Sequence, residues 1–277
     1  MSRLLRTNFL RMWKSKVFWL CGGFLFGFAL YQVISQYIFG VRYHEIVYLD
    51  ESIFAVAVVG IFAQAVFTSL FFGVEYSEGT MRNKLMVGHT RCSIYMANLI
   101  TSISAGIIFV TVWLIPYATL GAVLMERENS WLMILMFFFT ILFEISVFSA
   151  IFVFIMMLCS SRAISSVICL ILSLVIICVG NIVESRLEEP ETVSPYELAT
   201  DGRLVESEPQ KNPRYLPEGS GKRVAFEFLS DYLPGNQGLK LARVQCDKME
   251  HFIGYDLVNI ALLSGVGYFL YKRKDLK

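Results

Sequence analysis

The stretch that decides the fold is residues 52–91, which read SIFAVAVVGIFAQAVFTSLFFGV followed by EYSEGTMRNKLMVGHTR. The first part carries no charge and exceeds the roughly 20 residues that a helix needs to cross a membrane. The second part is a short charged island, and residues 92–125 after it are again uncharged. A polar segment held between two such spans stays close to the membrane surface. The pattern therefore predicts a membrane protein with a segment at the membrane surface that a partner protein can bind.

The composition of the whole chain points the same way. Hydrophobic residues make up 56% of the 277 residues and charged residues only 17%, against roughly 25% charged residues in an ordinary soluble domain. In lipid each backbone polar group must be bonded within the protein, so a long apolar run is a helix. We therefore predict an all-α membrane protein with a single transmembrane domain over residues 1–277. Its six spans are 17–39, 52–73, 94–124, 132–158, 163–183 and 254–271.

The Lys and Arg residues set the expected orientation, because the cytoplasmic loops of membrane proteins carry an excess of both. The N-terminus, the charged island, the loop at Arg162 and the C-terminal tail are basic and share one side of the predicted bundle. The other short loops hold only Arg42 and Arg127. We expect a multi-pass protein of the plasma membrane with both termini in the cytoplasm. The net charge of +1 gives no indication of a nucleic-acid partner.

Residues 1–16 predict an amphipathic helix that lies in the membrane interface, because apolar residues gather near one face and basic residues cover the remainder. The apolar residues are Leu5, Phe9, Met12 and Trp13, and the basic ones are Arg3, Arg6, Arg11 and Lys14. A plain positively charged anchor is the alternative interpretation.

The segment 184–253, between the fifth and sixth spans, differs from the rest of the chain. All but one of the 7 prolines lie in it. Residues 184–222 are polar and predict an irregular excursion, and residues 223–233 predict a helix. Pro234 then breaks the chain before a second short helix. We expect a small extracellular segment, for which a tolerated loop insertion and a role in substrate handling are equally compatible with the sequence.

Side chains that carry chemistry are scarce. Of the 6 cysteines only Cys246 lies clearly outside the predicted membrane region, and no metal-ligand spacing such as C-x-x-C occurs. The 3 histidines are scattered. The phosphate-binding pattern G-x-x-x-x-G-K-[ST] is missing from the sequence. We therefore expect no enzyme activity, no metal site and no cofactor in this chain.

The charged island carries a resemblance to a known family. Its residues EYSEGTMR at 75–82 and GHTR at 88–91 follow the pattern E-Y-x-x-G-T-x-R, then a short gap and G-x-(S/T)-R. This is similar to the integral membrane subunits of type-2 ABC exporters, and most similar to the peptide, bacteriocin and bacitracin-type exporters. The basic N-terminus, the six spans and the basic tail agree with the resemblance.

The resemblance implies that residues 75–91 form a coupling helix, set in a cleft of an ATPase subunit. Glu75 and Glu78 would lie near its start, where the helix dipole favours negative charge. Gly79 would allow a bend or a close approach, and Thr80 would cap the following turn. An ordinary cytoplasmic loop is the alternative. The implied coupling residues are Glu75, Tyr76, Glu78, Gly79, Thr80, Arg82, Lys84 and Arg91.

Two residues inside the spans stand out. Glu144 is an ionisable group in the middle of the fourth span, where such groups are costly and face a protein interior or a water-filled path. It is either a substrate-facing or gating carboxylate, or a carboxyl group bonded to a neighbouring helix through Thr140, Ser146 or Ser149. Pro116 predicts a kink in the third span.

These features lead to two functional expectations. The first is a permease that pairs with a second copy or a paralogue and with two ATPase subunits, which hold the ATP and Mg²⁺. It would export an amphipathic or hydrophobic substrate, such as a peptide, an antimicrobial or a lipid-like molecule, out of the cell, and membrane lipid would be a further partner. The alternative is a non-transporting ABC membrane subunit that acts as a sensor or mechanical transmitter to an external partner.

Overall fold

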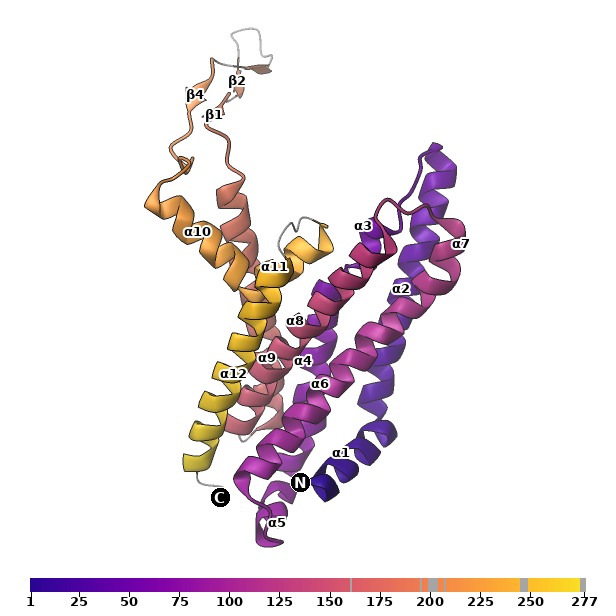
Figure 1. Cartoon of the computed structure of the whole chain (residues 1–277), viewed down its shortest axis with the longest axis vertical. Helices are drawn as coiled ribbons and strands as arrows, with labels where there is room; N and C mark the ends of the chain where they lie inside the picture. The colour runs from indigo at the N-terminus through magenta and orange to yellow at the C-terminus, as the bar shows by residue number, and fades with distance from the viewer. Residues whose placement is uncertain (160, 195, 199–203, 207, 245–248, 275–277) are drawn as a thin grey trace.

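The computed structural model describes residues 1–159, 161–194, 196–198, 204–206, 208–244 and 249–274 (Figure 1). Within these ranges six helical stretches are long and apolar enough to cross a membrane. They are Lys16–Tyr43, Asp50–Ser77, Arg91–Leu124, Trp131–Leu158, Arg162–Leu187 and Met249–Arg273. The predicted architecture of six long apolar helices is therefore confirmed, and the chain is a multi-pass helical membrane protein.

Four of the six stretches are single helices: α2 (Lys16–Tyr43), α8 (Trp131–Leu158), α9 (Arg162–Leu187) and α12 (Met249–Arg273). The second stretch joins α3 (Asp50–Ile53) to α4 (Val56–Ser77). The third begins as α6 (Arg91–Pro116). Its regular α-helical hydrogen bonding ends at Pro116, where the sequence predicts a kink. A π-helical turn (η1, Tyr117–Gly121) and the short α7 (Ala122–Leu124) follow.

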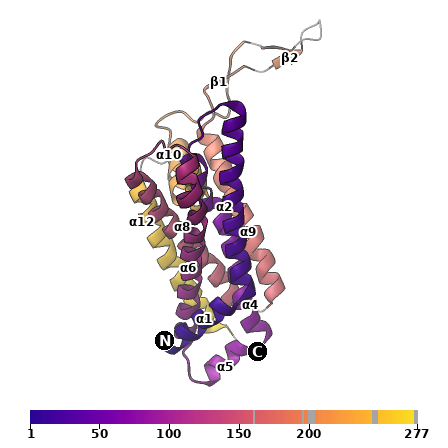
Figure 2. The same cartoon turned by 90° about the vertical axis from the view of Figure 1, so that its right-hand side faces the viewer.

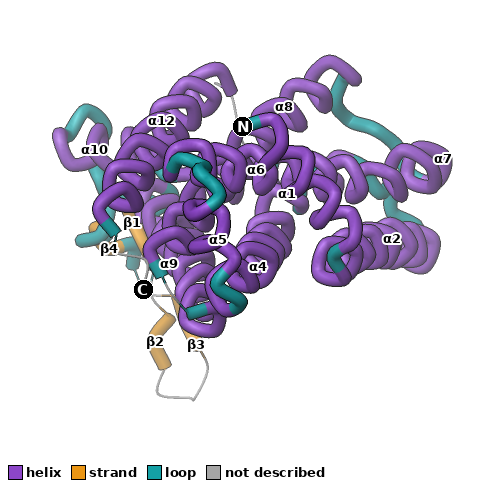
Figure 3. The backbone as a smooth tube through the Cα atoms, turned by 90° about the horizontal axis from the view of Figure 1, so that it is seen from below, coloured by secondary structure: helices purple, strands orange, loops and turns teal. Residues whose placement is uncertain are grey.

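The helices α4 and α8 form the middle of the bundle. The helix α8 packs against α4, α6 and α12, and α4 also packs against α9 and α2. Figures 1 and 3 show α2 and α12 on opposite sides, with α4 and α6 between them. The outer helices α2, α9 and α12 expose many large apolar side chains, as expected for surfaces that face lipid rather than water.

One end of the bundle holds the N-terminus, the end of α12 and two short helices, α1 (Ser2–Lys14) and α5 (Thr80–Met86) (Figures 1 and 2). We call it the terminal end, and the opposite end the far end. The helix α1 packs against α6 and buries Leu4, Asn8 and Met12, which are four residues apart. Of the predicted apolar face, Met12 is buried and Trp13 is exposed.

The segment between α9 and α12 contains more regular structure than its composition predicts. The helix α9 continues to Leu187, and two antiparallel strand pairs follow: β1 (Thr192–Val193) with β4 (Gln210–Lys211), and β2 (Tyr196–Leu198) with β3 (Leu204–Glu206). The prediction of an irregular 184–222 was therefore wrong in part. Cys246 lies outside the described residues.

Two helices complete the segment, α10 (Gly221–Tyr232) and α11 (Pro234–Ala242). Both agree with the predicted pair, but Pro234 is the first residue of α11 rather than a break ahead of it. Proline suits that position, because its missing N–H would have no helical partner there. The helix α11 packs against α9, α4 and α8 and buries Gly235, Asn236, Gln237, Gly238 and Leu241.

Candidate functional site

The backbone of residues 75–91 forms a turn, a short helix and a second turn rather than one helix. The helix α4 runs through Ser77, and Gly79 then adopts a φ of 68°, in the left-handed region that favours glycine. The helix α5 occupies Thr80–Met86, and Gly88 reverses the chain again with a φ of 94°. The prediction of a bend at Gly79 is confirmed, while the predicted continuous helix is replaced by a protruding α5.

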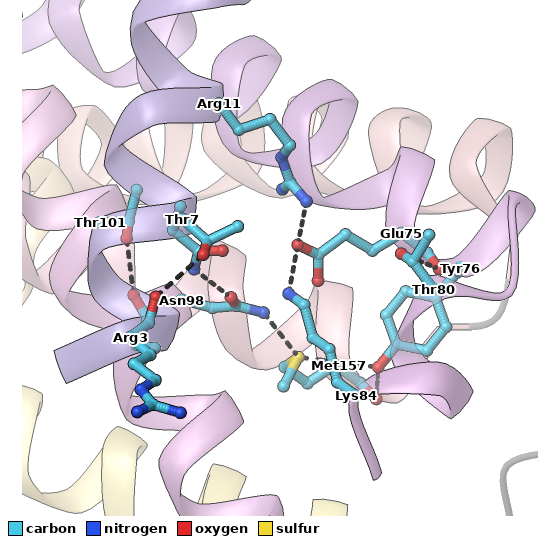
Figure 4. A network of polar contacts seen from close by, with 12 residues as sticks. Arg3, Thr7, Arg11, Glu75, Tyr76, Thr80, Lys84, Asn98, Thr101 and Met157 are labelled. Atoms are coloured by element: carbon cyan, nitrogen blue, oxygen red, sulfur yellow. Dashed lines mark hydrogen bonds and ion pairs between the residues drawn. The ribbon is translucent and has the colours of Figure 1, made fainter. Parts of the chain in front are cut away.

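Glu75 lies at the centre of the polar contacts at this end (Figure 4). Its side chain is fully buried in the last turns of α4 and forms ion pairs with Arg11 of α1 and with Lys84 of α5. The Lys84 Nζ to Glu75 Oε1 distance is 2.6 Å, and the Arg11 guanidinium lies 4.3 Å from the centre of the Phe71 ring. One carboxylate therefore links three helices.

The predicted relation of Glu75 and Glu78 to a helix start was wrong. Glu75 is near the C-terminal end of α4, and Glu78 is the residue that ends it. The dipole at a helix C-terminus disfavours negative charge. The negative charge of Glu75 is therefore compensated by Arg11 and Lys84 and not by the backbone.

Thr80 and Tyr76 also act inside the protein. The Thr80 hydroxyl donates to the Glu75 carbonyl oxygen at 3.2 Å, so it caps the end of α4. The predicted role of Thr80 as a cap of the following turn was wrong, because Gly79 occupies the position before α5. The Tyr76 hydroxyl donates to the Met157 carbonyl oxygen at 3.0 Å, which ties the end of α4 to the end of α8 (Figure 4).

The outer surface of α5 has a different character. Glu78 and Arg82 are exposed. Beside them Met86 is 71% and Val87 is 78% exposed. The sequence analysis missed these two residues, although two adjacent apolar residues in a polar island were a usable signal. We call Glu78, Arg82, Met86 and Val87 the α5 tip.

Arg91 connects the other end of the island to α12. Its guanidinium donates to the Tyr271 carbonyl oxygen at 2.8 Å and to the Lys274 carbonyl oxygen, and it lies 5.6 Å from the centre of the Tyr271 ring. Lys274 in turn donates to the carbonyl oxygens of Met157 and Cys159 at 3.1 and 3.2 Å. The basic tail thus closes onto the ends of α6 and α8, which its charge alone did not predict.

Glu144 lies in the interior of the bundle, away from the α5 tip. Its side chain is fully buried, and neither carboxylate oxygen has a hydrogen-bond partner among the described residues. The hydroxyls of Thr140, Ser146 and Ser149 each donate to a carbonyl oxygen of their own helix instead. The predicted alternative, a Glu144 carboxyl bonded through these three side chains, was therefore wrong.

A second buried carboxyl group, Asp256, lies on α12, the helix that packs against α8 and its Glu144. It is also fully buried, and both of its oxygens are unpartnered within the described residues. The helix α11 lies against the same place, because a Cβ on Gly238 would meet Glu144 Oε1 at 2.2 Å. The sequence predicted no role for Asp256, because its position relative to Glu144 depends on how α8 and α12 pack.

No protein-family model matches this chain, and a comparison with curated proteins found no significantly similar sequence. The functional assignment below therefore depends on the residues and on their arrangement.

Proposed function

We propose that this chain is the membrane-spanning subunit of an ATP-driven exporter of the type-2 ABC class, with the α5 tip as its docking surface for an ATPase subunit. The observation that carries the proposal is the anchoring of α5. A short helix with exposed apolar and charged residues protrudes from the bundle, and the buried Glu75 fixes its base to α1 and α4. A helix that is fixed in this way transmits a displacement to the helices that hold it.

Polar contacts lead from α5 to four of the six spans. Lys84 meets Glu75 at the end of α4, and Tyr76 beside it bonds to the end of α8. On the other side Arg91 starts α6 and holds the last turn of α12. A displacement of α5 by ATP-driven closure of a partner would therefore act first on α4 and then, through Tyr76 and Arg91, on α8, α6 and α12.

The proposed orientation places the terminal end in the cytoplasm. The N-terminal helix, the α5 region and the end of α12 are all basic, which favours the cytoplasmic side of the plasma membrane. In this orientation α1 lies along the inner membrane interface, and α10, α11 and the strand pairs lie outside the cell. Two ATPase subunits, which bind the ATP and Mg²⁺, and a second permease copy or paralogue complete the assembly.

The proposed cargo is amphipathic or hydrophobic, such as a cationic peptide, an antimicrobial or a lipid-like molecule. The buried interior offers apolar side chains and the carboxyl groups of Glu144 and Asp256, while buried polar side chains such as Gln64 and Ser102 bond to each other. Unpaired polar groups are costly in such surroundings, so an apolar molecule with a positive group suits the interior better.

A second candidate function is a non-transporting subunit that passes force from the ATPase to an external partner. The observation that favours it is the strand-containing excursion between α9 and α10, which projects beyond the ends of the spans in Figures 1 and 2. Substrate-stimulated ATP hydrolysis in reconstituted vesicles separates the two, because only the exporter is expected to respond to a transported molecule.

The docking proposal is tested with a Met86→Asp, Val87→Asp double variant. We expect the variant to reach the membrane with a normal unfolding temperature but to lose its ATPase subunit on purification. Val123→Asp is the matched control, because Val123 is also highly exposed, at 82%, but lies at the far end. Normal co-purification of the ATPase and normal ATP-driven transport by the double variant would overturn the docking role of the α5 tip.

A further inference from the structure

Glu144 and Asp256 present four acceptor atoms without a donor. Both side chains are fully buried, and all four carboxylate oxygens lack a hydrogen-bond partner among the described residues. An ionised carboxylate only accepts hydrogen bonds, so neither residue can satisfy the other while both are charged. Two such groups in a medium of low dielectric constant repel each other, and either a proton or a positive partner relieves that repulsion. The pair therefore has the chemistry of a vacant counter-ion for a cation.

A cavity of about 540 Å³ lies directly outward from the pair, between α8 and α12. Its walls include Leu135, Phe139 and Met249, and its inner residues are Thr140 and Ile253. Thr140 precedes Glu144 by four residues and Ile253 precedes Asp256 by three, so each lies one helical turn outward on the same helix face. The cavity thus ends about one turn, roughly 5 Å, from the carboxylates.

The walls of the cavity and the charge beneath it select a chemical class of ligand. The walls are mainly apolar side chains, which suit a hydrocarbon or aromatic body. The unpartnered carboxylates suit an ammonium head, which brings a positive charge and several N–H donors. A divalent metal ion fits poorly, because Ca²⁺ takes 6–8 oxygen ligands and no group of three or more His, Cys, Asp and Glu side chains that could hold a metal occurs in the described part of the chain.

The helix α11 covers Glu144 from another side. Gly238 lies against Glu144 so closely that a side chain would collide with the Oε1 atom. Lys240 of α11 is engaged by other carboxylates, because it bonds to Asp231 at 2.9 Å and lies 3.8 Å from Glu184. The cavity between α8 and α12, whose lining also includes His251, is the approach that we assign to a positive ligand.

We infer that Glu144 and Asp256 form the anionic end of a binding site for a hydrophobic organic monocation, which enters through the cavity between α8 and α12. The inference rests on the proposed function only in naming this cation as the exported cargo. The binding site itself needs no ATPase, so binding and coupling can be tested separately.

The test measures binding of radiolabelled decylammonium to the purified full chain in nanodiscs of uncharged phosphatidylcholine, with empty nanodiscs subtracted. Decanol is the neutral match of the probe. We expect Glu144→Gln and Asp256→Asn each to weaken decylammonium binding roughly tenfold or more, as loss of a charge-assisted hydrogen bond implies. Binding of decanol should not change. Glu227→Gln is the matched control, because Glu227 is an exposed carboxylate on α10 that does not line the cavity.

A further variant keeps the test decisive if a carboxylate variant fails to fold. Ile253→Trp fills the inner end of the cavity and leaves both carboxylates in place, and it should abolish decylammonium binding. The inference is overturned if wild-type protein binds decanol as tightly as decylammonium, or if either folded carboxylate variant binds decylammonium as wild type does. Loss of ATPase docking in the α5-tip variant with unchanged decylammonium binding would show that the two sites are independent.

Discussion

Arg11 of α1 and Glu75 of α4, 64 residues apart in the chain, form an ion pair in which the carboxylate is fully buried. Lys84 of α5 reaches the same carboxylate oxygen. These two ion pairs fix the base of α5 to α1 and α4. Glu75 therefore has an internal role, and only the exposed residues of 75–91 are accessible to another molecule.

Replacing Glu75 by Gln should destabilise the protein. Breaking a buried ion pair costs about 3–5 kcal/mol, and we expect roughly 2–3 kcal/mol here because the Arg11 side chain is still 35% exposed and can be solvated. The measurement is chemical or thermal unfolding in detergent. Glu78→Gln is the control, since Glu78 is exposed and should leave stability unchanged. Equal stability of the two variants would contradict the clamp.

Replacing Gly79 by Ala should loosen α5, because a left-handed conformation costs a residue with a side chain about 1–2 kcal/mol. Gly79→Asn should be milder, since Asn tolerates this region of φ. Hydrogen exchange of the amides in 80–86 measures the effect, and faster exchange is expected in the Ala variant than in the Asn variant. A Cβ at Gly79 would meet nothing within 4 Å, so a side chain there causes no steric clash. Identical exchange in wild type and both variants would therefore refute the backbone argument.

Replacing Gly238 by Ala should force α11 away from α8, because the new Cβ would lie 2.2 Å from Glu144 Oε1. Overpacking of this kind costs about 1–3 kcal/mol. The unfolding temperature measures the effect. Gly254→Ala serves as the comparison, because a Cβ on Gly254 meets nothing within 4 Å. An equal effect of both substitutions would mean that α11 does not press on Glu144.

Replacing Arg91 by Lys should release the end of α12, although the substitution retains the positive charge. The planar guanidinium serves two carbonyl oxygens, those of Tyr271 and Lys274, whereas an ammonium group lacks this forked geometry. Faster hydrogen exchange in residues 271–274 is the expected result. Arg82→Lys, on the exposed face of α5, should leave this region unchanged. Unaltered exchange in Arg91→Lys would show that the tail is held by other contacts.

The proposed orientation predicts which end of the bundle is accessible from outside the cell. In a protein with all natural cysteines replaced, Glu218→Cys should react with a charged, membrane-impermeant maleimide on intact cells, because Glu218 is exposed at the far end. Arg82→Cys, at the α5 tip, should react only after permeabilisation. The reverse labelling pattern would show that the protein has the opposite orientation in the membrane. It would exclude the α5 tip as a cytoplasmic docking surface.

The sequence by itself determined the six spans and the break at Pro116, because lipid imposes a local requirement. Each span must be apolar for its whole length and must satisfy its own backbone, and both conditions can be read from consecutive residues. The bend at Gly79 was equally local. In the charged island the helix boundary misled the prediction, because an acidic pair next to an apolar run fits both the end of one helix and the start of the next.

Only the tertiary structure decided which distant residues meet. The contacts of Arg11 with Glu75 and of Arg91 with the end of α12 join helices that no periodic pattern pairs. The packing of α12, which carries Asp256, against α8, which carries Glu144, is equally absent from the pattern. Apolar spans pack through shape, since hydrocarbon side chains contact lipid and protein about equally well. The sequence therefore determines that the helices cross the membrane, while side-chain packing determines which charges are compensated and which two carboxylates remain without a partner.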